Sequence, residues 1–191
     1  RCSTSHRTST CRPFLRGRLD PFHVERSTRI KDVLRICPLH GGGKTSFALN
    51  VVANMARRGI KIGVISIEMS AGELLERLYA NEAGIALDRF EEPMTDEEVA
   101  RFESARAYVD KWNLHIDEAT LQTIESAPKM FEKMRKEFGI EIGFLDYIEL
   151  LTDDASRTAT ERMTRSSHAL LRTVHHLGIP LVVLAQFNRT A

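Results

Sequence analysis

The segment Val33-Leu34-Arg35-Ile36-Cys37 is mostly apolar, and Gly41-Gly42-Gly43-Lys44-Thr45 follows it closely. A helical pattern begins directly after the glycines and continues to about Arg58. A strand, a glycine-rich turn and a helix in this order are the context of a phosphate-binding loop. Glycines let backbone N–H groups approach a phosphate, and the helix directs its positive end at the same anion. The segment therefore predicts that the chain binds a nucleotide.

The expected nucleotide contacts lie within this loop. The ammonium of Lys44 reaches the β- and γ-phosphates, and the hydroxyl of Thr45 binds Mg²⁺. The full motif has glycine five residues before Gly43, where this chain has Pro38, which has a fixed φ and no N–H. We expect this proline to alter the loop entry; the alternative is a glycine-rich turn with a coincidental Lys-Thr. The predicted nucleotide-binding residues of the loop are Gly41, Gly42, Gly43, Lys44, Thr45 and Ser46.

Apolar runs and helical patterns alternate along the rest of the chain. Strands are predicted at 33–37, 62–67, 114–116, 142–145 and 180–185, and helices at 44–58, 71–83, 96–111, 123–138 and 158–177. Thr95 and Glu98 have the spacing of a capping box, and Gly139 stands where a helix would end. Because the strands are continuously apolar, they indicate a parallel sheet covered by helices on both faces, which is an α/β fold.

Polar residues follow three of these strands. Asp146 closes the strand at 142–145, at the sheet edge expected to hold the phosphate loop, and is predicted to hold Mg²⁺ there through its water shell. Glu68 fits a base that activates water, or an acid that complements a helix dipole. Gln186 fits a sensor of the γ-phosphate, or a polar loop residue. The residue types alone leave these alternatives open, as well as the alternative that Asp146 merely begins a loop.

Four motifs carry a resemblance to a known family. They are Gly43-Lys44-Thr45-Ser46-Phe47-Ala48-Leu49-Asn50, Ser66-Ile67-Glu68-Met69-Ser70, Leu145-Asp146-Tyr147 and Gln186-Phe187-Asn188-Arg189. In order and rough spacing, residues 33–190 resemble the C-terminal RecA-like ATPase domain of the DnaB-type replicative helicases, which are hexameric motors. The Glu-Met and Gln-x-Asn-Arg motifs are more specific than the phosphate loop, which many families share.

The resemblance implies a RecA-like P-loop NTPase fold with ATP and Mg²⁺ as cofactors. It implies that Glu68, Lys44 and Gln186 are catalytic, with Glu68 as the base and Gln186 coupling the γ-phosphate to DNA-binding loops. Thr45 and Asp146 are the Mg²⁺ residues. The implied partners are single-stranded DNA and, in the full-length protein, five further copies in a homo-hexamer. The implied location is the cytoplasm of a prokaryote or a phage replisome, with organellar import left open.

The sequence departs from the family pattern at several points. Pro38 and the Gly41-Gly42 pair are unusual, and Glu149 stands where the family commonly has Gln. The family's motor domain continues beyond the strand before Gln186, so we expect residues 31–191 to be a motor domain that is incomplete at its C-terminal end. Two other functions stay open. One is a recombinase-like or clock-protein-like ATPase, and the other is a remnant that binds nucleotide without hydrolysing it.

Charge and composition separate the first 30 residues from the rest. Residues 1–31 hold eight basic and two acidic side chains, a balance of +6, while the other 160 residues carry −5. Residues 1–30 lack a helical or strand period and are predicted to be a disordered basic arm; a nucleic-acid-binding arm, a transit peptide and an unstructured end are the alternatives. No run of about 18 apolar residues predicts a membrane helix. The three cysteines form no CxxC pair, which argues against a disulfide scaffold or a cysteine zinc site and fits a reducing compartment.

Overall fold

The computed structural model describes residues 33–36, 43–118, 123–146, 151–152 and 158–185. The predicted arm at 1–30 lies outside these residues. The described elements are β1 (Val33–Ile36), α1 (Lys44–Ala56), β2 (Ile62–Ser66), α2 (Ala71–Ala83), the 3₁₀ helix η1 (Leu87–Glu91), α3 (Asp96–Val109), β3 (Leu114–Glu118), α4 (Ser126–Phe138), β4 (Ile142–Asp146), α5 (Ala159–Leu177) and β5 (Leu181–Leu184).

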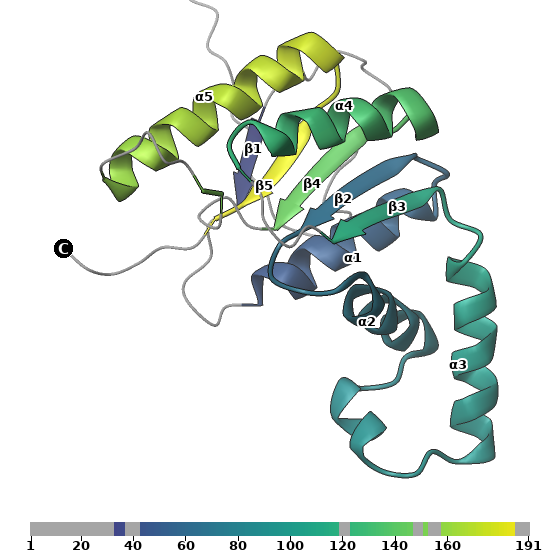
Figure 1. Cartoon of the computed structure of the whole chain (residues 1–191). Helices are drawn as coiled ribbons and strands as arrows, with labels where there is room; N and C mark the ends of the chain where they lie inside the picture. Colours follow the sequence, from purple (N-terminus) through teal and green to yellow (C-terminus); the bar gives the residue numbers. More distant parts are fainter. Residues whose placement is uncertain (1–32, 37–42, 119–122, 147–150, 153–157, 186–191) are drawn as a thin grey trace, which may run out of the picture.

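The five strands form one parallel sheet in the order β1-β5-β4-β2-β3. In Figure 1 all five arrows point the same way, with α4 and α5 on one face and α1 on the other. The predicted α/β class with a parallel sheet is therefore confirmed. Because parallel strands end at a common edge, the segments that follow β2 and β4 leave the sheet side by side.

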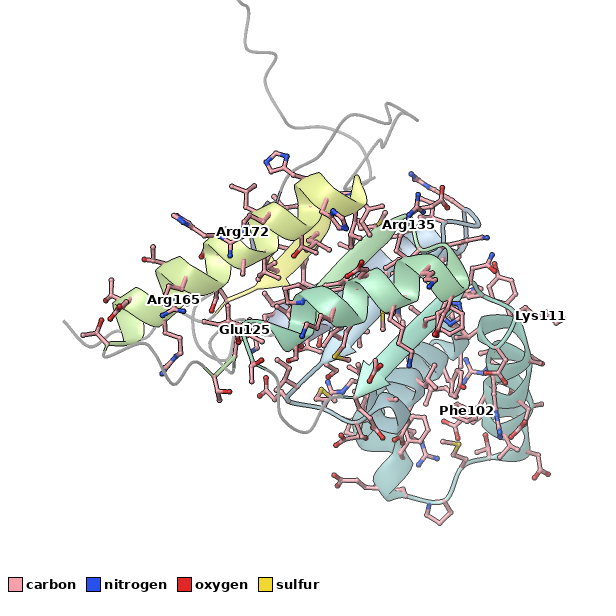
Figure 2. The ribbon with its side chains drawn as sticks, turned by 45° about the horizontal axis from the view of Figure 1, so that its top comes forward. Phe102, Lys111, Glu125, Arg135, Arg165 and Arg172 are labelled. Carbon is pink, nitrogen blue, oxygen red and sulfur yellow. The ribbon has the colours of Figure 1, made fainter. Side chains whose placement is uncertain are left out.

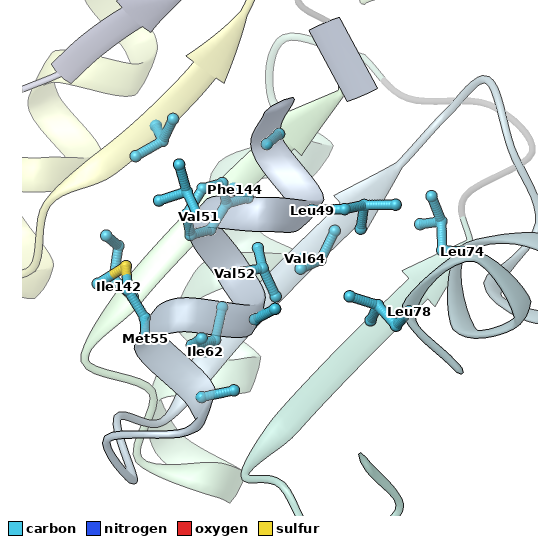
Figure 3. Close-up of a cluster of buried hydrophobic side chains, with 14 of the residues drawn as sticks. Leu49, Val51, Val52, Met55, Ile62, Val64, Leu74, Leu78, Ile142 and Phe144 are labelled. Atoms are coloured by element: carbon cyan, nitrogen blue, oxygen red, sulfur yellow. The ribbon is translucent and has the colours of Figure 1, made fainter. Parts of the chain in front are cut away.

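Alternate residues of each strand enter two different hydrophobic cores. Val64, Phe144 and Val182 pack under α1 and α2, as Figure 3 shows for the first two. Their neighbours Ile65, Leu145 and Val183 pack under α4 and α5. Both faces of the sheet are thus buried, which explains why the strands read as continuous apolar runs rather than as alternating ones.

The helix pair α2 and α3 extends away from the sheet, with η1 between them (Figure 1). Both halves of the predicted capping box are present at the start of α3. Thr95 Oγ1 accepts a hydrogen bond from the Glu98 N–H, and the Glu98 carboxylate accepts one from the Thr95 N–H. Phe102, labelled in Figure 2, packs edge-on against Tyr79 of α2 and Phe90 of η1. A small aromatic cluster therefore joins the two helices.

Some predicted boundaries were wrong. The helix predicted from residue 123 begins at Ser126, because Thr123 forms a bridge to Thr152 and caps the helix with its side chain. The strand predicted at 114–116 extends to Glu118, because β2 pairs with it over its whole length. The predicted end of α4 is confirmed, since Gly139 adopts the left-handed conformation there. In the described part of the chain, no helix has both the length and the apolar character to cross a membrane.

Candidate nucleotide-binding site

The start of α1 is built as a phosphate-binding loop requires. Gly43 precedes the helix with φ 69° and ψ 33°, a left-handed conformation that glycine adopts without strain. Glycine has no side chain with which to cap the helix, whereas Ser70, Thr95 and Thr158 cap α2, α3 and α5. The N-terminus of α1 therefore keeps its positive end directed at the carboxyl edge of the sheet, where an anion can bind.

Thr45 and Asp146 meet at this edge, although 101 residues separate them in the chain. The Thr45 hydroxyl donates a hydrogen bond of 2.8 Å to Asp146 Oδ2. Lys44 Nζ lies 3.7 Å from the other carboxylate oxygen, Oδ1. Asp146 is the last residue of β4 and is 4% exposed. Burial raises the pKa of its carboxyl, the Thr45 hydrogen bond and the Lys44 charge partly oppose this rise, and the Glu68 charge adds to it.

Asp146 and Thr45 fit a magnesium site. Oδ1 of Asp146 is buried and accepts no hydrogen bond, so this oxygen is available to a cation or to the cation's water shell. Mg²⁺ typically binds through one or two carboxylates together with nucleotide phosphates and waters, rather than in an all-protein cage. Within the described residues no cluster of three or more His, Cys, Asp or Glu forms such a cage. The donor set therefore suits a metal that arrives with a nucleotide.

Glu68 reaches the same point from β2. Its Oε2 lies 3.0 Å from Lys44 Nζ, and its side chain is 48% exposed. Ser66, two residues earlier, pairs in register with Asp146, so the adjacent strands β2 and β4 bring the two carboxylates to one edge. Glu68, Lys44 and Asp146 thus form a charged cluster in which one ammonium lies between two carboxylates.

Other predicted residues are not placed in this cluster. Ser46 is exposed on the first turn of α1, where its carbonyl accepts a hydrogen bond from Asn50. The positions of Gly41, Gly42 and Gln186 lie outside the described residues, as do those of Pro38 and Glu149.

Two side chains at this edge were missed by the sequence analysis. Ser66 was quoted within a motif without a role, and Glu118 was not singled out. The Ser66 hydroxyl bonds to the backbone of Met69, and the Glu118 carboxylate accepts a hydrogen bond from the Ala71 N–H. A signal for Glu118 exists in the sequence, because it follows a short strand as Glu68 and Asp146 do.

Known proteins share this sequence pattern and fold. The chain is 28% identical over 149 residues to a probable plasmid replicative DNA helicase of Chlamydia trachomatis, covering 77% of this chain and 33% of that protein. It is 22% identical over 163 residues to the replicative DNA helicase DnaB of Geobacillus stearothermophilus, covering 83% of this chain and 36% of that protein. The chain thus spans about a third of the length of these relatives.

Solved structures agree on the fold. One of them, a helicase-like ATPase domain, superimposes with a TM-score of 0.74 at 24% identity, over 83% of this chain and 57% of that chain. A DnaB-like replicative helicase, solved in a study of its interactions with primase, gives a TM-score of 0.75 at 23% identity, over 83% and 40%. These likenesses confirm the RecA-like fold. The family model of the DnaB-like helicase C-terminal domain matches residues 31–191, and the chain therefore belongs to that family.

Proposed function

We propose that residues 31–191 belong to the motor of a DnaB-type replicative helicase, which hydrolyses ATP to move along single-stranded DNA. The observation that carries this proposal is the convergence of Lys44, Thr45, Glu68 and Asp146 from three separate segments at one sheet edge. Family membership favours this function over a recombinase-like or clock-protein-like ATPase. The proposal includes a homo-hexameric ring, as the resemblance implies, and action in the cytoplasm.

Each residue has a role that its position supports. Lys44 leaves Glu68 and binds the β- and γ-phosphates, while the N–H groups at the start of α1 bind the neighbouring phosphate oxygens. Thr45 and Asp146 hold Mg²⁺, which neutralises charge on the phosphates when it is bound. Glu68, half exposed and free of Lys44, accepts a proton from the water that attacks the γ-phosphorus. Gln186 follows β5 and is proposed to sense the γ-phosphate.

The test is hydrolysis of ATP by purified variants. Lys44→Ala and Glu68→Gln are each expected to lower kcat by at least about 100-fold, since each removes a group that acts on the transferred phosphoryl or the water. Lys133→Ala and Glu137→Gln, at exposed positions on α4, are the matched controls and should keep wild-type turnover. Unchanged hydrolysis in both site variants would contradict the site assignment.

A second measurement addresses the DNA partner and the non-hydrolysing alternative. Single-stranded oligodeoxythymidine is expected to stimulate ATP turnover more than a duplex of equal length. A fluorescent ATP analogue that binds wild-type protein without any turnover, with or without oligonucleotide, would favour the nucleotide-binding remnant instead. Turnover that ignores single-stranded DNA would contradict the motor function while leaving the ATPase site intact.

A further inference from the structure

We propose that Ser66 is a positioning residue for Glu68, because its buried hydroxyl closes the turn that carries the proposed base. This inference rests on the proposed function, since it takes Glu68 as the residue that activates water. Glu118 supports the same turn from the neighbouring strand.

The Ser66 hydroxyl makes two hydrogen bonds to one residue. It donates to the Met69 carbonyl at 2.7 Å and accepts from the Met69 N–H at 3.2 Å. Ser66 is only 1% exposed, so water does not compete for these bonds. Glu68 lies inside the loop of chain that they close, and its backbone is therefore held at both sides.

Two further hydrogen bonds fasten this turn to the sheet. The Ile67 N–H donates to the Asp146 carbonyl at 2.9 Å, which links the Glu68 backbone directly to β4. Beyond the turn, the Ala71 N–H donates to Glu118 Oε2 at 2.7 Å, which ties the start of α2 to β3. The proposed base and the proposed metal-binding acid consequently share one rigid frame.

Glu68 needs such a frame because its own side chain is half exposed. Its ion pair with Lys44 does not hold it during hydrolysis, since Lys44 is then expected on the phosphates. The backbone of the turn is what remains to direct the carboxylate at the attacking water. A displacement of about 1 Å in such an arrangement is enough to cost about 100-fold in rate.

The experiment measures kcat, KM for ATP and Kd for ADP in Ser66→Ala. We expect kcat to fall between about 10- and 100-fold, with KM and Kd within about threefold of wild type, because Lys44 and Thr45 bind nucleotide without this turn. In single-turnover assays on a Glu68→Gln background, Ser66→Ala should lower the residual rate by less than about twofold, since residues that act as a unit are non-additive.

Glu118 provides a second pair of variants that does not disturb the core. Its side chain is exposed, so Glu118→Ala tests the tie to α2 with little risk to folding. We expect Glu118→Ala to lower kcat between about three- and tenfold, and Glu118→Gln, whose amide oxygen still accepts from Ala71, to keep most of it. This pair decides the question if Ser66→Ala does not fold.

Several results would overturn the inference. One is wild-type kcat in Ser66→Ala or, if that variant does not fold, in Glu118→Ala. Another is an equal fall in rate with and without Glu68, because Ser66 would then act independently of it. Loss of ADP binding in Ser66→Ala would make the residue a part of the binding site rather than a positioning residue. Failure of the proposed function itself is distinguished by wild-type turnover in Glu68→Gln alone.

Discussion

Lys44 Nζ lies 3.0 Å from Glu68 Oε2, so the lysine expected to bind phosphate contacts the carboxylate expected to activate water. Both groups have other tasks once a nucleotide is bound, and the pair must therefore separate. A half-exposed ion pair of this kind contributes about 0.2–1 kcal/mol, which is small enough for a phosphate to displace it. The contact thus acts as a weak competitor of the nucleotide.

The first prediction concerns this competition. Glu68→Gln removes the competing charge and should tighten ADP binding between about 1.4- and 5-fold, which corresponds to about 0.2–1 kcal/mol. ADP is the ligand of choice because the affinity is then independent of hydrolysis. A fluorescent ADP analogue titrated into wild type, Glu68→Gln and the exposed control Glu137→Gln measures the effect. Equal or weaker binding by Glu68→Gln would show that the ion pair does not compete with the nucleotide.

The second prediction concerns the hydroxyl of Thr45. Thr45→Ala removes both the hydrogen bond to Asp146 and the proposed Mg²⁺ ligand, so the Mg²⁺ concentration at half-maximal hydrolysis should rise at least about tenfold. Thr45→Ser keeps the hydroxyl and should stay within about threefold of wild type. Chelation with EDTA should abolish hydrolysis in all three proteins. The same Mg²⁺ requirement in Thr45→Ala and wild type would remove Thr45 from the metal site.

The third prediction concerns the close packing of α4 on the sheet. Gly63 and Gly143 are paired in register on β2 and β4, and both lie under side chains of the α4 face. A Cβ at Gly143 would lie 2.5 Å from Leu181 Cδ2 and 2.6 Å from Phe131 Cε1, both in the core. Gly143→Ala should therefore lower the free energy of unfolding by about 1–3 kcal/mol, as other overpacked cores do.

Urea unfolding of wild type and variant checks this value. Gly72→Ala is the matched control, because a Cβ there meets only Ser70 Oγ at 3.9 Å and the position is helical. Alanine should stabilise that position by up to about 1 kcal/mol. If both substitutions shifted the unfolding midpoint alike, the tight contact at Gly143 would not be the cause.

The fold was predictable because its elements carry strong local signals. The strands β2, β4 and β5 are buried on both faces, which gives unbroken apolar runs, and Gly139 ends α4 with a conformation that favours glycine. The sheet order was not predicted. It depends on which strands pair across the sheet, and no local pattern records that choice.

The site was predictable only where a residue type implies its chemistry. Lys44 and Asp146 stand at strand and helix ends where an ammonium and a carboxylate have few structural uses. Ser66 and Glu118 act through backbone groups of other residues, Met69 and Ala71, and such contacts leave no pattern in one sequence. The 3₁₀ helix η1 was missed for a similar reason, since a helix of five residues has no amphipathic period.

The fourth prediction concerns the junction between α2 and α3. The Tyr79 hydroxyl donates a hydrogen bond of 2.7 Å to Asp110 Oδ1. Burial and, next, the bond to this carboxylate raise the pKa of Tyr79 from about 10 to about 12. The folded protein therefore holds the phenolic proton more tightly than the unfolded chain does. The resulting stability is fully present below about pH 10 and is lost as the pH rises from about 10 through about 12.

Tyr79→Phe isolates this effect, because the variant keeps the ring contact with Phe102 and loses the hydrogen bond. At about pH 8 the wild type should exceed the variant by about 1 kcal/mol in the free energy of unfolding. Between about pH 10 and 12 this difference should shrink, since ionised Tyr79 faces the Asp110 charge. Urea unfolding at about pH 8, 10 and 11 measures the difference, with Tyr108→Phe as the control for a phenol lost at an exposed site of α3. A difference that stays constant over this range would show that the hydrogen bond to Asp110 does not contribute to folding.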